Sequence, residues 1–150
     1  MERISIHIKR MEHSRDLPFP KYESEGASGM DIRAAVKGPV LLEPGQIGLI
    51  PTGLIVSIPP GYEGQIRPRS GLALNHGIGM VNAPGTIDSD YRGEIGIILI
   101  NWGSKPFTIK RGDRIAQMVI GRVYRADIVH VDKLDTTRRG EGGFGHSGVS

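Results

Sequence analysis

Glycine and proline interrupt this chain too often for long helices, and no other feature limits its possible folds as strongly. There are 22 glycines and 10 prolines among 150 residues, and both residue types disfavour helices. The segments between them are short and rich in β-branched residues, which favour strands. Ile4, Ile6 and Ile8 alternate with polar residues as in a half-buried strand, and residues 94–101 (EIGIILIN) are apolar on both faces as in a core strand. The sequence therefore predicts an all-β sandwich or barrel.

Turn residues separate two further pairs of predicted strands. Residues 40–42 and 47–50 flank a Glu-Pro-Gly turn, and residues 107–109 and 114–119 flank a Lys-Arg-Gly-Asp turn. Each pair is therefore predicted to form a hairpin. Gln117 lies within the last of these strands, where its side chain could reach a ligand or simply face water.

The helix candidate is short and begins beside a cluster of potential anion ligands. It spans residues 70–77, with Ser70 as a favourable N-cap and Gly77 at its end. Arg67 and Arg69 precede it, and guanidinium groups at a helix N-terminus are suited to bind phosphate. The alternative is a capped helix whose arginines lie in solvent.

Composition limits the possible partners and compartments. The chain has no cysteine, so disulfides and thiolate metal sites are excluded. Its 19 basic and 16 acidic residues are spread along the chain, whereas a nucleic-acid-binding protein more often concentrates basic charge. No apolar run has the length of a signal peptide or a membrane span. We expect a single-domain cytoplasmic protein that binds neither nucleic acid nor membrane.

The C-terminal end differs in composition from the rest. The apolar pattern stops at Lys133, and residues 138–150 are polar and rich in glycine, which predicts a mobile tail. Glycines near Arg139 would allow backbone N–H groups to surround an anion, and Phe144 could stack on a base. The spacing does not match a Walker loop. The alternative is a glycine-rich terminus without a function.

Three acidic residues fall within seven positions of a predicted turn. Asp88, Asp90 and Glu94 surround Tyr91 and Arg92. A carboxylate beside apolar neighbours can act as a base that orients water, while turn formation and strand initiation explain the other two acids. Spacing alone supports a catalytic role for one of the three. A base, phosphate ligands and a stacking aromatic together indicate a nucleotide site.

Five ordered motifs connect the chain with a known family. They occupy residues 29–34 (GMDIRA), 67–73 (RPRSGLA), 85–94 (GTIDSDYRGE), 112–118 (GDRIAQM) and 139–148 (RGEGGFGHSG). The chain resembles the homotrimeric deoxyuridine triphosphatases, which hydrolyse dUTP to dUMP and pyrophosphate, exclude uracil from DNA and supply dUMP for dTMP synthesis. The resemblance implies a distorted jelly-roll β-barrel over residues 1–133. It also implies that residues 134–150 form a flexible arm closing over a site of a neighbouring subunit.

The resemblance assigns roles to individual residues. Asp88 matches the base that activates the water attacking the α-phosphorus. Tyr91 matches the residue beneath the deoxyribose, where its ring would exclude a 2′-hydroxyl. Asn82 and the backbone around Gly96 match the groups that recognise uracil, and Asp31 matches a supporting acid of the first motif.

The other matched positions are implied to hold the triphosphate or to enclose the substrate. The implied phosphate ligands are Arg69, Ser70, Gly71, Gln117, Arg139 and Ser147. Phe144 matches the aromatic residue that covers the base. The remaining implied substrate contacts are Gly85, Thr86, Ile87 and Gly145. Mg²⁺ is the implied cofactor, held by phosphates and water without a direct protein ligand.

One residue departs from the family pattern, and two alternative functions remain. His146 occupies a position where the family usually has serine, and because histidine titrates near neutral pH, arm closure is predicted to be pH-dependent. A dCTP deaminase of the same fold would need a glutamate in the strand containing residues 96–100, which has none. Zinc-type deaminases are excluded, because they need cysteine ligands and this chain has no cysteine. The second alternative is a non-catalytic nucleotide-binding regulator, against which Asp88 argues.

Overall fold

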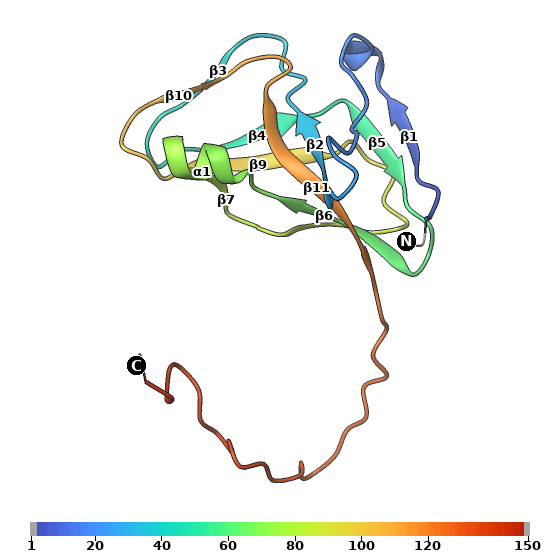
Figure 1. Ribbon diagram of the computed structural model, residues 1–150, viewed down its shortest axis with the longest axis vertical. Helices are drawn as coiled ribbons and strands as arrows, with labels where there is room; N and C mark the ends of the chain where they lie inside the picture. Colours follow the sequence, from blue (N-terminus) through green and yellow to red (C-terminus); the bar gives the residue numbers. More distant parts are fainter. Residues whose placement is uncertain (1–2, 149–150) are drawn as a thin grey trace.

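The protein is described from a computed structural model in which residues 3–148 are placed (Figure 1). The outer ends of the predicted domain and arm, residues 1–2 and 149–150, lie outside the described residues. The first strands are β1 (His7–Arg10), β2 (Gly29–Arg33), β3 (Val40–Leu42), β4 (Ile47–Pro51), β5 (Leu54–Ser57) and β6 (Tyr62–Arg67). The later strands are β7 (Ile78–Met80), β8 (Gly85–Ile87), β9 (Gly96–Asn101), β10 (Phe107–Ile109) and β11 (Arg114–Arg122). The helices are the 3-10 turn η1 (Glu12–Ser14) and α1 (Ser70–His76).

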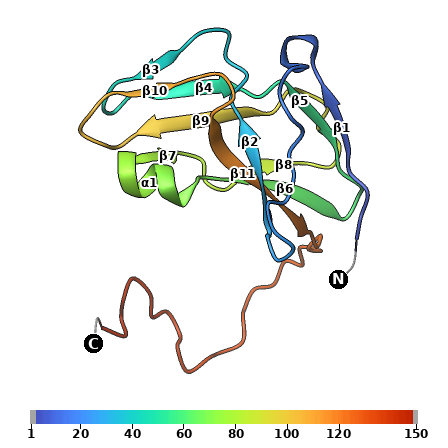
Figure 2. The same cartoon turned by 45° about the horizontal axis from the view of Figure 1, so that its top comes forward.

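The strands form a distorted jelly roll, as predicted, but their sheets do not close into a continuous barrel. Within residues 3–148, four antiparallel sheets have the strand orders β1-β5, β10-β3, β2-β11-β6-β8 and β4-β9-β7. Figures 1 and 2 show the two larger sheets packed around a shared interior, with α1 lying beside β7. Most neighbouring strands are distant in sequence, so this topology depends on long-range pairing.

Both predicted hairpins are wrong, although the predicted strands exist. β3 pairs with β10, whereas β4 pairs with β9. After the second turn, β11 leaves β10 and pairs with β2 and β6. Each turn therefore carries the chain from one sheet to another, because the apolar faces on its two sides are buried against different partners.

The interior is built mainly from isoleucine, leucine and methionine on facing strands. In β9, Ile97 and Leu99 are fully buried, as predicted for a core strand. Ile32 and Met118 contribute to the same core from β2 and β11. The N-terminal strand begins later than predicted, at His7, although alternate side chains before it are half-buried.

α1 occupies the predicted position but has a different N-cap. Arg69, rather than Ser70, is the N-cap residue, and no side-chain hydrogen bond caps the helix. The C-terminus follows the prediction: Gly77 has φ 67°, and its N–H bonds to the carbonyls of Ala73 and Leu72. The positive φ explains why glycine ends the helix.

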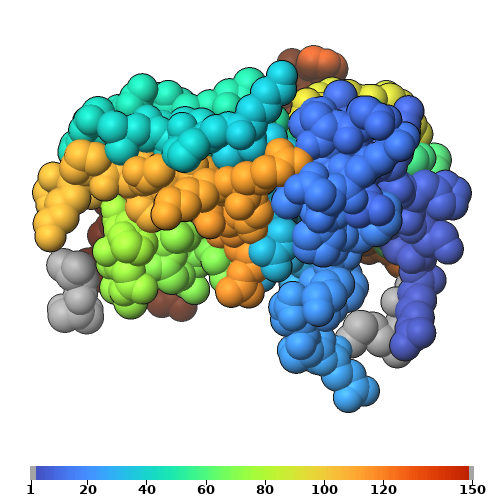
Figure 3. Space-filling model, turned by 90° about the horizontal axis from the view of Figure 1, so that it is seen from above, coloured from blue at the N-terminus to red at the C-terminus, as the bar shows by residue number. Residues whose placement is uncertain are grey.

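The N-terminal segment is anchored across the surface by one arginine. Arg111 donates from Nε and Nη2 to the two carboxylate oxygens of Asp16, at 3.0 and 2.6 Å, and from Nη1 to the carbonyl of Val36. This hydrogen bonding lowers the pKa of Asp16 below 3.8. Figure 3 shows the blue N-terminal segment directly beside the orange segment that follows β10. The residues that follow η1 are thereby held beside Val36, between β2 and β3.

Beyond β11 the chain leaves the body. Residues 123–148 are almost entirely exposed and extend away from the sheets in both cartoon views (Figures 1 and 2). The boundary at residue 133 and the flexibility of the arm stay predictions. Within residues 3–148, no helix has the length and apolar character needed to cross a membrane.

Candidate active site

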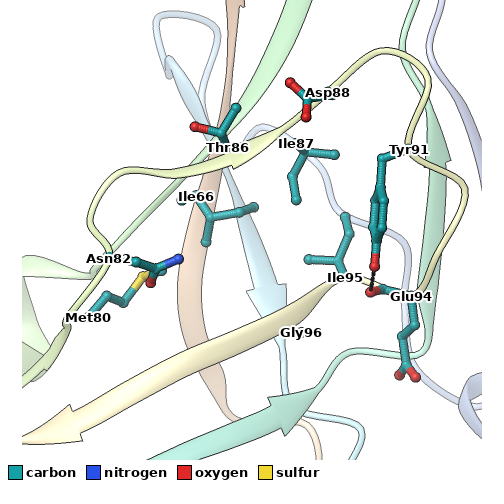
Figure 4. A pocket seen from close by; sticks show the side chains of 11 residues that line it. Ile66, Met80, Asn82, Thr86, Ile87, Asp88, Tyr91, Glu94, Ile95 and Gly96 are labelled. Carbon is teal, nitrogen blue, oxygen red and sulfur yellow. Dashed lines mark hydrogen bonds between the residues drawn. The ribbon is translucent and has the colours of Figure 1, made fainter.

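A small open pocket lies between β8, the loop that follows it and the start of β9 (Figure 4). Its volume is about 190 Å³. The structure brings seven of the predicted site residues together here: Asn82, Gly85, Thr86, Ile87, Asp88, Tyr91 and Gly96. The rest of the lining consists of Ile66, Met80, Glu94 and Ile95.

Strand pairing places an apolar floor beneath one polar amide. β8 pairs with β6, so Gly85 lies opposite Ile66 and Ile87 opposite Gly64. A methyl group on Gly85 would lie 3.3 Å from both the Nδ2 atom of Asn82 and Ile66. Because Gly85 has no side chain, the Asn82 amide can lie close to the apolar floor of the pocket.

The predicted base and the predicted sugar-binding aromatic come from one tight turn. The N–H of Tyr91 donates to the carbonyl of Asp88 at 3.2 Å, which brings both side chains to the same rim. Asp88 is exposed, and within residues 3–148 no hydrogen bond or ion pair engages its carboxylate. Such a carboxylate is free to accept a proton from water.

The predicted phosphate ligands of the second and fourth motifs form a separate cluster. The register of β2, β11 and β6 places Asp31, Gln117 and Arg67 side by side. Asp31 forms an ion pair with Arg69, whose Nε lies 3.2 Å from Oδ1, and accepts a hydrogen bond from Arg114 Nη1 at 3.0 Å. The carboxylate therefore orients two guanidinium groups. Its supporting role in a substrate site stays a prediction.

This cluster is distinct from the pocket and includes a residue that sequence reasoning missed. Gln117 donates through Nε2 to the carbonyl of Pro68 at 3.1 Å, so it lies beside the start of α1 with Ser70 and Gly71. None of these residues lines the pocket. Arg114 was not singled out, although its place in the fourth motif was a usable signal.

The arm residues lie apart from both groups. Arg139 donates through Nε to the carbonyl of Gly142 at 2.7 Å, which closes a local turn. Phe144 is fully exposed, and its φ is 48°. Gly145, His146 and Ser147 lie in the same turn as Phe144. Within residues 3–148 of one chain, the pocket, the arginine cluster and the arm are therefore separate. Figure 2 shows the arm running away from the sheets.

Metal-binding side chains are dispersed in the part of the chain that the structure describes. Among residues 3–148, no three His, Cys, Asp or Glu residues gather closely enough to hold an ion. Asp88 is the acidic side chain at the upper rim of the pocket, while the Glu94 carboxylate points away from it (Figure 4).

The jelly-roll fold, the small pocket with a free carboxylate, and the paired arginines define a nucleotide-binding enzyme of the all-β class. Comparison with known proteins gives the family. The chain belongs to the dUTPase family, whose model matches residues 15–148.

Curated relatives and solved structures agree with this assignment. The deoxyuridine 5′-triphosphate nucleotidohydrolase of Caldanaerobacter subterraneus subsp. tengcongensis is 60% identical over 97% of this chain and 99% of its own. That of Methylocella silvestris is 56% identical over 99% of this chain and 94% of its own. The dUTPase of Staphylococcus bacteriophage 80alpha, solved as a mutant with dUpNHpp, is 28% identical, with a TM-score of 0.86 over 97% of this chain and 99% of that one.

Proposed function

We propose that this protein hydrolyses dUTP to dUMP and pyrophosphate. The observation that carries the proposal is the pocket, in which an amide, a free carboxylate and an aromatic ring meet over an apolar floor. Family membership and the related nucleotidohydrolases support the same substrate. The reaction would keep uracil out of DNA and supply dUMP for dTMP synthesis. Because nucleotide pools are made and used inside the cell, we propose a cytoplasmic location.

Base and sugar selectivity would come from different walls of the pocket. The Asn82 amide and the backbone at Gly96 face the space suited to uracil. An amide can rotate to exchange its donor and acceptor, whereas backbone groups cannot, so the backbone must carry the discrimination against cytosine. Tyr91 stands at the edge of the pocket, where its ring would exclude a ribose 2′-hydroxyl.

Asp88 would accept the proton of the attacking water while that water adds to the α-phosphorus. The pyrophosphate leaves from the opposite side and is held by Arg69, Gln117 and the backbone at the start of α1. Mg²⁺ would neutralise charge on the triphosphate oxygens. The dispersed acids of this chain fit an ion held by the substrate and water, since such ions often retain several waters.

The separation of pocket and arginine cluster supports a site shared between subunits of a homotrimer. Ile47, Leu49 and Trp102 expose 54%, 71% and 64% of their surface on or beside the β4-β9-β7 sheet. Along residues 123–134, apolar side chains such as Ile128 are also exposed. Exposed apolar surface of this kind favours association. Residues 134–150 would then close over a neighbouring subunit's pocket.

A mixing experiment tests the shared site. Asp88→Asn removes the proposed base from one part, and Arg69→Ala removes a phosphate ligand from the other. If the parts come from different subunits, random mixed trimers contain about a quarter intact sites, so two inactive proteins regain activity when refolded together. A mixture that stays inactive, or a monomer by light scattering, argues against this arrangement.

The activity is tested by pyrophosphate release from dUTP, dCTP, dTTP and UTP with Mg²⁺. We expect dUTP to be turned over far faster than the other three nucleotides, and its turnover to be abolished in Asp88→Asn with nucleotide binding retained. Binding without cleavage by the unaltered protein would favour a regulator. Release of ammonia from dCTP would instead favour the deaminase of the same fold.

A further inference from the structure

We propose that Glu94 is a positioning residue that fixes the ring of Tyr91 and thereby sets the preference for deoxyribose over ribose. This inference rests on the proposed function of the pocket. Glu94 lines the pocket, but Figure 4 shows its carboxylate directed away from the space that a nucleotide would occupy. Its two polar ends hold different parts of the molecule.

The backbone end of Glu94 holds the aromatic ring. The hydroxyl of Tyr91 donates to the Glu94 carbonyl at 2.9 Å, drawn as the dashed line in Figure 4. Glycine between them makes this contact possible, because a methyl group at Gly93 would collide with the hydroxyl end of the ring. The ring is therefore attached at both its backbone and its hydroxyl.

The carboxylate end of Glu94 holds the β4–β5 connection. Its Oε1 atom accepts the N–H of Gly53 at 2.8 Å. The adjacent residue is fixed to the same connection: the N–H of Ile95 donates to Leu54, and the buried hydroxyl of Thr52 donates to the Ile95 carbonyl at 2.6 Å. The pocket wall thus rests on a buried turn rather than on a free loop.

The N-terminal segment supports the β4–β5 connection. The Gly53 carbonyl accepts the N–H of Met11 at 2.8 Å and the hydroxyl of Ser14 at 2.9 Å. Ser14 is only 1% exposed. Nε2 of His13 lies 3.6 Å from Oε1 of Glu94, the same oxygen that accepts the N–H of Gly53. A continuous set of contacts therefore runs from η1 through Gly53 and Glu94 to the ring.

Selectivity depends on this support because excluding a 2′-hydroxyl requires a ring that does not move aside. A displacement of well under the size of a hydroxyl group relaxes such exclusion, and binding sites lose precision when their supporting contacts are removed. Glu94 itself touches no substrate in this arrangement, so its effect acts through Tyr91.

The test compares kcat/KM for dUTP with kcat/KM for UTP in each variant. This ratio cancels any change in the amount of folded enzyme. Glu94→Ala is expected to lower the ratio about three- to tenfold, the effect of one lost hydrogen bond. Glu94→Gln keeps an acceptor for Gly53 and should retain the ratio. Glu43→Ala, in the exposed turn before β4, is the matched control and should leave it unchanged.

Tyr91→Phe provides an independent arm because it deletes only the hydroxyl. It should lower the ratio as Glu94→Ala does. The double variant should add little further loss, since the two changes break successive hydrogen bonds of one set of contacts between the ring and the β4–β5 connection. An unchanged ratio in Glu94→Ala or in Tyr91→Phe overturns the positioning role while dUTP turnover persists. Absence of dUTP turnover in the unaltered protein overturns the proposed function as well.

Discussion

Replacing Gly53 by alanine should destabilise the protein far more than the same change at Gly45, although both glycines have positive φ. The φ values are 64° for Gly53 and 81° for Gly45, in the region that L-residues avoid. A methyl group at Gly45 meets nothing within 4 Å, whereas at Gly53 it collides with the Cβ and hydroxyl of Ser14. The two substitutions therefore share a backbone cost and differ in a steric one.

The shared cost is modest, and the steric cost is not. A left-handed alanine costs about 1–2 kcal/mol, partly offset by a less flexible unfolded chain, so Gly45→Ala should lose about 1 kcal/mol of unfolding free energy. At Gly53 the buried Ser14 cannot turn away without breaking its hydrogen bonds to Met11 and Gly53. Overpacking adds about 1–3 kcal/mol, and an unsatisfied buried polar group a similar amount. With the backbone cost, we expect a total loss of about 3–7 kcal/mol.

The measurement is denaturant unfolding of both variants at one protein concentration, because association also contributes to apparent stability. In thermal scans the losses correspond to about 3 °C for Gly45→Ala and about 10–20 °C for Gly53→Ala. Ser14→Gly removes the colliding atoms, so in that background Gly53→Ala should cost only the shared backbone amount. Equal losses at the two glycines, or no relief in the Ser14→Gly background, would refute the steric reasoning.

Three further changes test other parts of the molecule. Because Arg111 lowers the pKa of Asp16, the contribution of this carboxylate to stability is present above about pH 4 and is lost as the pH falls through the lower folded value; the difference in unfolding free energy between the protein and Asp16→Asn should therefore shrink below pH 4. Deleting residues 134–150 should impair dUTP turnover while leaving the melting temperature nearly unchanged, as the arm extends away from the sheets; a large drop in melting temperature would contradict this. The KM for dUTP should depend more on pH between pH 6 and pH 8 in the unaltered protein than in His146→Ser, because an imidazole replaces the hydroxyl usual at this position; identical KM profiles would contradict the role of the imidazole.

Local sequence signals located the strands but not their partners. The turn after Val40–Leu42 and the turn after Phe107–Ile109 were correctly found, because glycine and proline mark turns through backbone geometry alone. Pairing depends instead on which buried faces meet, and the residues of β10 that pair with β3 lie 65 to 69 positions later in the sequence. Local sequence signals therefore predicted hairpins at two turns where the chain instead passes from one sheet to another.

The same distinction separates the site residues that could be predicted from those that could not. Asp88 and Tyr91 share a short turn, so their proximity follows from the sequence. The direction of the Glu94 carboxylate could not be foreseen, because it is set by an N–H group 41 residues earlier. The pairing of Arg114 with Asp31 likewise depends on the register of β2 and β11. Spacing left three acids as candidate bases, and their surroundings in the fold separate Asp88 from Glu94.

The pocket is open to water in the single chain, and closure of the arm is expected to exclude that water. Asp88 and Tyr91 are exposed in the single chain, and a water-filled site weakens the electrostatic contacts that stabilise a transferred phosphoryl group. If the glycine-rich arm is flexible as predicted, ordering it costs conformational entropy that only a ligand with enough charge can offset. Arg139 and His146 can contact a triphosphate more fully than a monophosphate. We therefore expect the arm to close on dUTP and to open once pyrophosphate leaves. Loss of the negative charge of pyrophosphate would release the arm, and the open arm would let dUMP leave.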